Sequence, residues 1–380
     1  MKKLKGALFL TCLGAFFWLF FSQRSQAFSI DQMKTVHSGQ MDPEKIKELV
    51  KKDGVEKCFT PLVRAPFKYE TIETDPLYLQ CVARDTLEYI NRFQATHKHV
   101  FAPRLFSQRY FGESNVKKTL EFIIKAIEND KKKGKFRIND PDFIARNFSC
   151  IKWSGDYETA LKRNDIFFRP GKIRLTQYAV FQFPGRYEKT KEFCKPLMSL
   201  PFYDDELKVV RSGVLAWLTE AGYKDALMQG TVFVKMSGNP VGKTVQNGPN
   251  NAIKAFRLHL PQKMSAYKTM KDSEKVFYFC EIKGNQFKEL YTHCIQRKGI
   301  VFAGDIYNIG IGKIIALSYL NPKTKKPEMR LGVMADTGGA FVKNLYKLDY
   351  FAGIFSSRED FRKSMGNLPT VTDAYILYKK

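Results

Sequence analysis

Hydrophobic residues recur three and four positions apart in two stretches of the N-terminal third of the chain. Residues 76–94 (PLYLQCVARDTLEYINRFQ) and 116–129 (VKKTLEFIIKAIEN) share this spacing, which predicts two amphipathic helices. A shorter helix is expected over residues 42–52, where Pro43 suits a first-turn position. The run KKKGK at 131–135 predicts a solvated loop, and a specific contact with a polymer is the less favoured alternative.

The hydrophobic period changes after about residue 165. Short segments rich in β-branched and aromatic residues, most of them closely followed by Gly, Pro or Asn, predict strands at 173–183, 230–236, 275–282 and 313–319. A further strand at 329–334 is expected to form a hairpin with the preceding one, with a basic tip at 321–327. These strands indicate a closed or partly closed small barrel, because closure removes exposed strand edges.

The N-terminus has the pattern of a secretory signal peptide over residues 1–27. Lys2, Lys3 and Lys5 form a basic start, residues 6–21 are largely apolar, and a small-x-small site ends at Ala27. The alternative is an uncleaved anchor, since the apolar stretch comes close to the length that spans a bilayer. In both cases we expect the folded part outside the cytoplasm.

The composition excludes a disordered, collagen-like or coiled-coil chain. Of 380 residues 44% are apolar and 14% aromatic, which is enough for a large core. The formal net charge is +25, and it is still +21 without residues 1–27, which carry four basic residues and no acidic one. Such a charge favours a polyanionic neighbour, and in an exported protein it favours lipid or wall polymer over nucleic acid.

The cysteines and histidines predict neither a metal site nor a cofactor. Six cysteines follow the first 27 residues, an even number suited to a compartment where disulfides persist, and their pairing stays open: Cys58, Cys81, Cys150, Cys194, Cys280 and Cys294. No group of cysteines and histidines has the spacing of a zinc site. We therefore expect no structural metal.

The candidate chemistry lies in the last eighty residues, where three aspartates sit beside predicted strand ends. Asp336 opens the sequence DTGGA after a strand, and Asp349 follows thirteen residues later in LDYF. Upstream, Asp305 leads through residues 309–312 (IGIG) into another strand. Glycines let a second backbone or a substrate approach closely, so a carboxylate there is held while staying accessible. Taken alone, DTGG is more simply a β-turn.

The ordered set of aspartates resembles the three-aspartate domain of the membrane-bound lytic transglycosylase A family, a bacterial group that cleaves peptidoglycan. The segments that carry the resemblance are Asp305 with Ile309 and Gly312, residues 336–340, and Asp349-Tyr350-Phe351 with Gly353. Weaker similarities lie at 175–178, 233–238 and 247–249. Departures include Gln177 in place of a glycine, Gly310 in place of a proline, and the bulkier stretch 291–299 in place of a glycine-rich one.

The resemblance implies a mainly β fold with helices. Its core would be a double-psi β-barrel domain with an inserted second β domain and peripheral N-terminal helices. The implied domains are a signal peptide at 1–27, a polar and helical extension at 28–69, a barrel domain at 70–178 plus 270–380, and an inserted domain at 179–269.

The resemblance also implies a reaction. The family cuts the β-1,4 bond between N-acetylmuramic acid and N-acetylglucosamine and closes a 1,6-anhydro ring without water. One carboxyl suffices as acid and base, and Asp349 matches the family's catalytic position, with Asp336 as its neighbour and Asp305 holding the loops. In the reversed alternative, Asp336 is the acid and Asp349 orients it. The residues expected to contact the glycan are Thr176, Tyr178, Ser237, Gly238, Asn247, Thr337, Gly338 and Gly339.

A different class of protein stays open. Barrels of this kind also occur in non-catalytic wall-binding proteins, in which the aspartates would only brace loops. For both classes we expect a monomer that binds peptidoglycan strands in the envelope or periplasm of a Gram-negative bacterium. Peripheral membrane association through the N-terminal segment is a further expectation.

Overall fold

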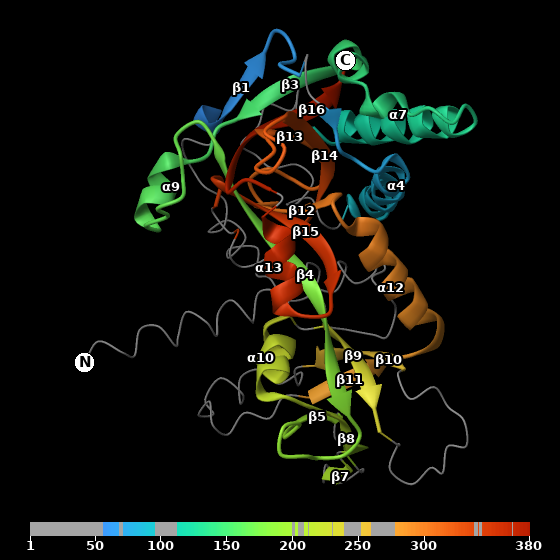
Figure 1. The fold of residues 1–380 in the computed structure, drawn as a ribbon. Coiled ribbons are helices and arrows are strands. Elements are labelled where there is room, and N and C mark those ends of the chain that lie inside the picture. The colour runs from blue at the N-terminus through green and yellow to red at the C-terminus, as the bar shows by residue number, and fades with distance from the viewer. Residues whose placement is uncertain are drawn as a thin grey trace. The chain divides into compact units, whose positions relative to one another are not determined.

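The chain folds into two compact units (Figure 1). In this computed structural model the described residues are 56–67, 71–95, 112–199, 202–203, 209–211, 213–229, 231–238, 252–259, 278–337, 341, 344–366 and 368–380. The first unit holds the described residues of 56–179, 293–353 and 361–380, and the second holds those of Val180–Thr292 and Ile354–Asp360. The predicted signal peptide and the predicted helix at 42–52 lie outside the described residues.

Two amphipathic helices cover part of the first unit, as their hydrophobic spacing predicts. Helix α4 (Pro76–Phe93) begins at Asp75, whose side chain accepts hydrogen bonds from two amides of the first turn, which stabilises the helix start. Helix α7 (Glu113–Lys131) packs against α4. In Figure 1 both helices lie beside the strands they contact, α4 on β14 (Pro327–Asp336) and α7 on β16 (Val371–Lys379).

Six strands of the first unit pair in a closed ring. Their order is β16, β13 (Ile314–Leu320), β14, β12 (Val301–Ala303), β15 (Lys347–Phe355) and β4 (Ile173–Arg186). The ring closes because β4 also pairs with β16, through Arg174 opposite Val371 and Ile173 opposite Thr372. The predicted barrel closure is confirmed for these strands, whereas the double-psi crossing stays a prediction.

Shorter elements complete the first unit. Strand β1 (Phe59–Leu62) pairs with β3 (Phe148–Trp153), which pairs with β16, while β2 (Thr71–Ile72) pairs with β14. Shorter helices that lie wholly in this unit are η1 (Glu56–Cys58), η2 (Arg137–Asn139), α8 (Pro141–Asn147) and α9 (Tyr157–Lys162). The fully buried indole of Trp153 donates a hydrogen bond to the carbonyl oxygen of Leu345 at 2.9 Å, which fixes the turn before β15.

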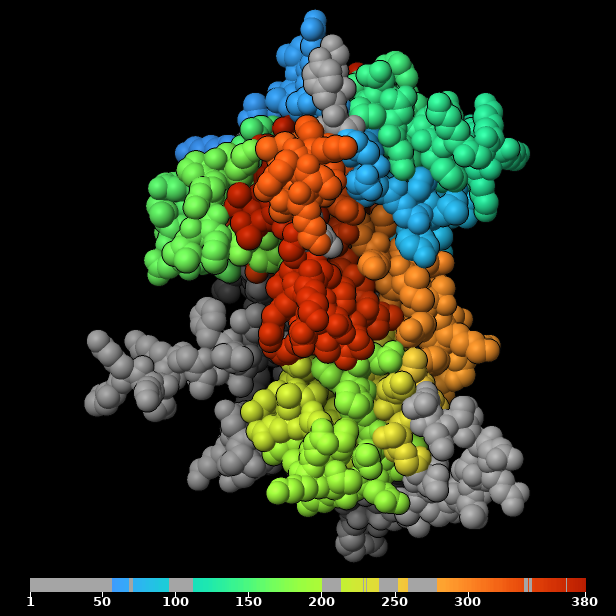
Figure 2. Space-filling view, viewed as in Figure 1, coloured from blue at the N-terminus to red at the C-terminus, as the bar shows by residue number. Residues whose placement is uncertain are grey.

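The hairpin of β13 and β14 has the basic tip that the sequence predicts. Leu320 pairs with Pro327, and the Asn321 side chain accepts the amides of the next turn, Lys323 at 2.8 Å and Thr324 at 3.0 Å. The lysines of this tip are exposed, and Figure 2 shows the hairpin, in orange, at the surface. The lysine run at 131–135 is exposed as well, as expected of a solvated loop.

The second unit contains another closed ring of six strands. It consists of the far end of β4, β8 (Val214–Leu218), β5 (Lys195–Ser199), β11 (Tyr278–Ile282), β10 (Ile253–His259) and β9 (Thr231–Ser237), which returns to β4. Its helix α10 (Glu220–Gln229) contacts β5, β8 and β9. A small separate hairpin joins β6 (Phe202–Tyr203) to β7 (Val209–Arg211). The strands predicted at 230–236 and 275–282 are confirmed over their described residues, 231–236 and 278–282.

The expectation of a mainly β fold is wrong, since helices and strands contribute comparable parts of the described chain. The main reason is helix α12 (Gly284–Arg297), which occupies most of the stretch that the sequence reading left as a bulky segment between strands. Helix α13 (Arg358–Met365) follows β15 and was also not predicted. None of the described helices is long and apolar enough to span a membrane. The domain boundaries expected from the sequence stay a prediction.

The expectation of disulfides is not met either. All six cysteines after residue 27 are described, and none of them forms a disulfide. Cys58, Cys150 and Cys294 are buried, and burial raises the pKa of the thiols of Cys150 and Cys294 to about 12. In the described structure these buried cysteines therefore act as small apolar core residues.

Candidate active site

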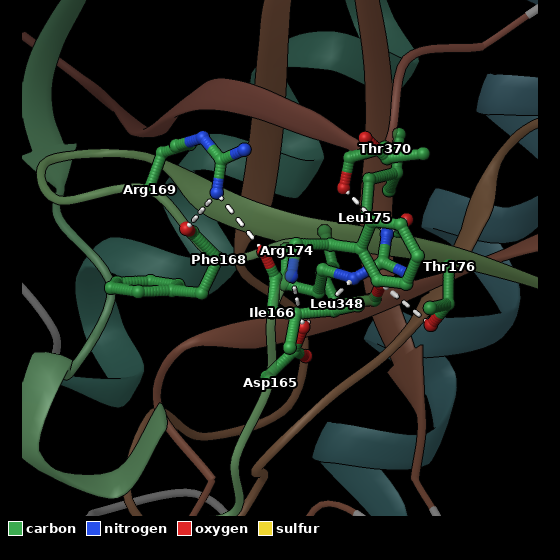
Figure 3. Close-up of polar contacts among 10 residues, drawn as sticks. Asp165, Ile166, Phe168, Arg169, Arg174, Leu175, Thr176, Leu348 and Thr370 are labelled. Carbon is green, nitrogen blue, oxygen red and sulfur yellow. Dashed lines mark hydrogen bonds and ion pairs between the residues drawn. The ribbon is translucent and has the colours of Figure 1, made fainter. Parts of the chain in front are cut away.

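Two neighbouring strands of the first ring, β4 and β15, carry the candidate residues on matching faces. Alternation along a strand puts every second side chain on the same face. On β4 this face holds Arg174, Thr176 and Tyr178, and on β15 it holds Lys347, Asp349 and Phe351. The strands meet where the Thr176 hydroxyl donates to the Leu348 carbonyl at 3.4 Å (Figure 3), and the rings of Tyr178 and Phe351 pack 5.1 Å apart.

Strand β12 brings Asp336 and Asp349 into one neighbourhood. Ala303 pairs with Asp336 of β14 on one side and with Asp349 of β15 on the other. Two strand spacings of about 4.8 Å place the Cα atoms of the aspartates roughly 10 Å apart. The two carboxylates are therefore close enough to influence each other's protonation.

Both oxygens of the Asp336 carboxylate accept hydrogen bonds. The hydroxyl of Tyr178 donates to Oδ2 at 2.6 Å, and the amide of Thr337 donates to Oδ1 at 2.7 Å. Burial raises the pKa of Asp336, and these two hydrogen bonds and the charge of Arg297 oppose the rise. The pKa of Tyr178 lies well above its usual range because the phenol is buried beside this carboxylate, so Tyr178 remains a proton-bearing donor.

The Asp349 carboxylate is held differently. It is half-buried, and its Oδ1 is shielded from solvent with no hydrogen-bond partner among the described residues. The pKa of Asp349 is raised to about 6. Burial is the main cause and the charge of Asp336 adds to it, while the charges of Lys347 and Arg174 oppose the rise. An unpartnered buried oxygen at this pKa suits a group that exchanges a proton near neutral pH.

Asp305 braces two loops. Its side chain is 0% exposed and accepts hydrogen bonds from the Asn308 amide at 3.2 Å, the Asn308 side chain at 2.6 Å and the Asn344 amide at 3.0 Å. Burial raises the pKa of Asp305 to about 7. Thr337 acts nearby in the same way, since its buried hydroxyl donates to the Gly304 carbonyl at 2.6 Å. This geometry favours a bracing role for Thr337 over the expected substrate contact.

The structure tests none of the other expected glycan contacts. Ser237 and Gly238 belong to the second unit, where the Ser237 hydroxyl donates to the Gly185 carbonyl at 3.2 Å. Asn247, Gly338 and Gly339 lie outside the described residues. The described residues hold no group of three His, Cys, Asp or Glu side chains that could bind a metal ion.

The loop after Asp305 explains one departure from the family pattern. Gly310 has a φ of 88° and Gly312 a φ of 83°, in the left-handed region that glycine tolerates. Proline is fixed near a φ of about −65°, so this loop does not follow the path that the family's proline would impose. A side chain at Gly312 would also meet Val116 of α7 at 2.8 Å, so close packing requires this glycine.

A pocket of about 310 Å³ opens at the start of β4 and β15. It is lined by loop residues 163–167, by Arg174 and Thr176 of β4, and by Asn344, Tyr346 and Lys347. The sequence reading missed Arg174 and Lys347. The sequence nevertheless contains a signal for both residues. Arg174 lies two positions before Thr176 and Lys347 two positions before Asp349, so each shares a strand face with an expected site residue.

No protein-family model matches the sequence, and no curated protein matches it. Solved structures similar to this chain include lytic murein transglycosylases.

Three of these structures show the extent of the similarity. The membrane-bound enzyme from Agrobacterium tumefaciens is 12% identical, with 84% of this chain and 97% of that chain covered and a TM-score of 0.47. MltA of E. coli, solved with bound chitohexaose, is 14% identical. The match covers 90% of this chain and 98% of that chain, with a TM-score of 0.44. LtgG of Burkholderia pseudomallei is 12% identical. The match covers 85% of this chain and 96% of that chain, with a TM-score of 0.40.

Proposed function

We propose that this protein is a peptidoglycan lytic transglycosylase that uses Asp349 as its acid and base. The observation that carries the proposal is the Asp349 carboxylate, with a buried, unpartnered oxygen and a pKa raised to about 6 beside a second, hydrogen-bonded aspartate. The sequence resemblance built on Asp305, Asp336 and Asp349 supports the same reaction.

Asp349 would serve in two successive proton transfers. The protonated carboxyl gives its proton to the glycosidic oxygen as the bond to C1 of the muramic residue breaks. The carboxylate then takes the proton of the C6 hydroxyl. At the same time the oxygen of that hydroxyl bonds to C1 and closes the 1,6-anhydro ring. The enzyme returns to its starting protonation state, and no water is consumed. A second catalytic carboxylate, which hydrolytic glycosidases use as nucleophile or base, is not needed.

Asp336 would keep Asp349 protonated through its negative charge. Its two oxygens are occupied by Tyr178 and Thr337, which suits a fixed charge better than a group that must reach the substrate. The reversed assignment makes a distinct prediction: the Asp336→Asn variant would then lose all activity, while Asp349→Asn would retain part of it. We expect the opposite order.

The partner and location follow from charge and from the N-terminal pattern. A net charge of +21 on the chain without residues 1–27 is attracted to a wall polymer whose stem peptides carry carboxylates. We propose export to the periplasm or envelope of a Gram-negative bacterium, with the protein acting as a monomer. Binding to sacculi is expected to weaken as the salt concentration rises, because salt screens this attraction.

Incubation of the full chain with purified sacculi tests the function. Mass spectrometry of the released fragments is expected to show 1,6-anhydromuramic ends. Fragments with reducing ends would instead identify a hydrolase. Sedimentation with the sacculi without any released fragment would identify a non-catalytic wall-binding protein, and either result would overturn the proposal.

A further inference from the structure

The pocket beside β4 and β15 has the charge pattern of an anion site. Three of its lining side chains are cationic, Arg163, Arg174 and Lys347, and only Asp165 is acidic. All four lie in the first unit, and the pocket is formed by the loop after α9 and the starts of two strands. Figure 3 shows the Asp165 carboxylate beside the Arg174 guanidinium.

Asp165 and Arg174 form an ion pair in the lining of the pocket. Arg174 Nε lies 3.5 Å from Asp165 Oδ1, and the Asp165 carboxylate also accepts the Phe167 amide at 3.0 Å. The Arg174 guanidinium donates to the carbonyls of Leu175 at 2.9 Å and Thr370 at 2.7 Å. The charge of the only lining acid is therefore balanced within the protein.

Lys347 is the cation that this pairing leaves without an acidic partner in the pocket lining, while its charge also acts on the Asp349 carboxyl. It is half-buried, and in the described part of the chain it makes no ion pair; its Nζ lies 5.6 Å from the centroid of the Phe341 ring. Arg163 adds a second, exposed positive charge to the lining. A partly desolvated ammonium next to a balanced pair attracts an anion more strongly than the same group in open water.

The pocket shares two strands with the candidate catalytic residues, β4 and β15. Lys347 lies two residues before Asp349 on the same face of β15, which is about 7 Å along a strand. Thr176 lines the pocket and donates to the carbonyl of Leu348, the residue between them. A group bound near Lys347 would therefore lie about one sugar's width from the Asp349 carboxyl.

We infer that this pocket binds a carboxylate carried by the glycan next to the bond that is cleaved. The inference rests on the proposed function. A volume of about 310 Å³ accepts an acidic side group and is too small for a second glycan strand. In peptidoglycan the carboxylate belongs either to the lactyl group of muramic acid, once its peptide is removed, or to the stem peptide. Both present the same chemistry to Lys347.

Binding measurements distinguish the two sources. The ligands are chitohexaose, which has no carboxylate, peptide-free glycan fragments with lactyl carboxylates, and peptide-bearing fragments. Calorimetry in an Asp349→Asn background prevents cleavage during the measurement. Adding Lys347→Gln is expected to weaken binding of the carboxylate-bearing ligand by about tenfold, the typical effect of losing one charge-assisted contact. Binding of chitohexaose is expected to stay unchanged.

The controls are chosen to isolate the pocket. Lys323→Gln removes the same charge from the exposed hairpin tip and is expected to leave all three affinities unchanged. Lys347→Arg keeps the charge and is expected to retain most of the binding. A loss confined to peptide-bearing fragments identifies the stem peptide as the source, and a loss confined to peptide-free fragments identifies the lactyl group.

Two results would overturn the inference. One is an equal loss on all three ligands, and the other is no loss on any of them. Failure of the proposed function is a separate result: the wild-type chain would then release no anhydro fragment from sacculi, whether or not its pocket distinguishes carboxylate-bearing ligands from chitohexaose.

Discussion

The loop of Asp305 and the strand of Asp349 use the same residue type in opposite ways. Burial raises the pKa of both carboxyl groups, to about 7 for Asp305 and to about 6 for Asp349. Asp305 is nevertheless surrounded by donors from Asn308 and Asn344, whereas Oδ1 of Asp349 is shielded and has no hydrogen-bond partner among the described residues. Asp305 is fully buried and Asp349 half-buried, yet burial raises the pKa of both, so what separates their roles is their hydrogen bonds.

This difference gives a rule for assigning roles to buried acids. A carboxylate whose oxygens accept backbone amides stabilises a fold, because removal leaves those amides without partners. A buried oxygen without a donor costs free energy, and its retention is better explained by a function such as proton transfer. On this argument we propose Asp305 as a structural brace and Asp349 as the proton donor.

The largest expected effect tests the Asp349 half of the comparison. Asp349→Asn preserves the shape of the side chain and removes its proton exchange, so release of muropeptides from sacculi is expected to fall by about 10²- to 10⁴-fold. The melting temperature is expected to stay close to that of the wild type. Mass spectrometry of released fragments and thermal unfolding measure the two quantities.

Asp373→Asn is the matched control for this variant. Asp373 lies on β16, is partly exposed and pairs with the ammonium groups of Lys152, at 3.5 Å, and Lys172. Its amide variant is expected to keep full activity. Near-wild-type release by Asp349→Asn would show that the proton donor is another group, with Asp336 as the next candidate.

The second effect tests the Asp305 half through stability. Asp305→Ala leaves the buried donors of Asn308 and Asn344 without an acceptor, and we expect the free energy of unfolding to fall by about 2–5 kcal/mol. Asp373→Ala removes only partly exposed ion pairs, and a loss of about 1 kcal/mol or less is expected. Urea unfolding of both variants provides the measurement, and equal losses would contradict a bracing role for Asp305.

Much of the first ring could be predicted from the sequence because its local patterns agree with its packing. The period of α4 and α7 and the alternation in β4 match the face that the structure buries, and the near-continuous apolar run of β13 matches its burial along almost its whole length. The basic hairpin tip was predictable for the same reason, since Asn and Pro mark the turn between two apolar strands. Asp305 and Asp336 stood out because glycines lie close to them, and Asp349 stood out through its place in the ordered set.

The rest depends on contacts between residues far apart in the chain. Nothing local indicates that Tyr178 donates to Asp336, which lies 158 positions away, or that Asp305 accepts the amide of Asn344. Helix α12 was missed because its hydrophobic residues, such as Phe287 and Tyr291, also suit a strand; in the structure their rings pack on Phe233 of β9. These contacts depend on the register of the paired strands and on the closure of each strand ring, and the pattern of a single sequence specifies neither.

A third, smaller effect concerns the pH dependence of the reaction. An acid must be protonated to act, and burial holds the pKa of Asp349 at about 6. We therefore expect kcat/KM to fall about tenfold per pH unit above pH 6 and to level off below it, until another group titrates. Initial rates on soluble glycan fragments from pH 4.5 to 8 give the profile. A rate that rises through this range would mean that the essential form of Asp349 is the carboxylate.

The smallest effect tests how Asp336 acts on Asp349. Tyr178→Phe removes the hydroxyl that donates to Asp336, so the pKa of Asp336 rises and its carboxyl becomes neutral more readily. The repulsion that raises the pKa of Asp349 then weakens, while the charges of Lys347 and Arg174 still lower it. The fall in kcat/KM is therefore expected at a lower pH, by less than about one unit.

Tyr319→Phe is the control, because the Tyr319 hydroxyl contacts Arg330 at 2.7 Å and none of the three aspartates. Its profile is expected to coincide with that of the wild type. The two roles considered for Tyr178 predict different changes: a sugar contact raises KM and leaves the pH profile in place, whereas positioning of Asp336 moves the profile. A Tyr178→Phe profile that overlies the wild-type curve would therefore remove Tyr178 from the proton-transfer machinery and leave Asp336 to act through its charge alone.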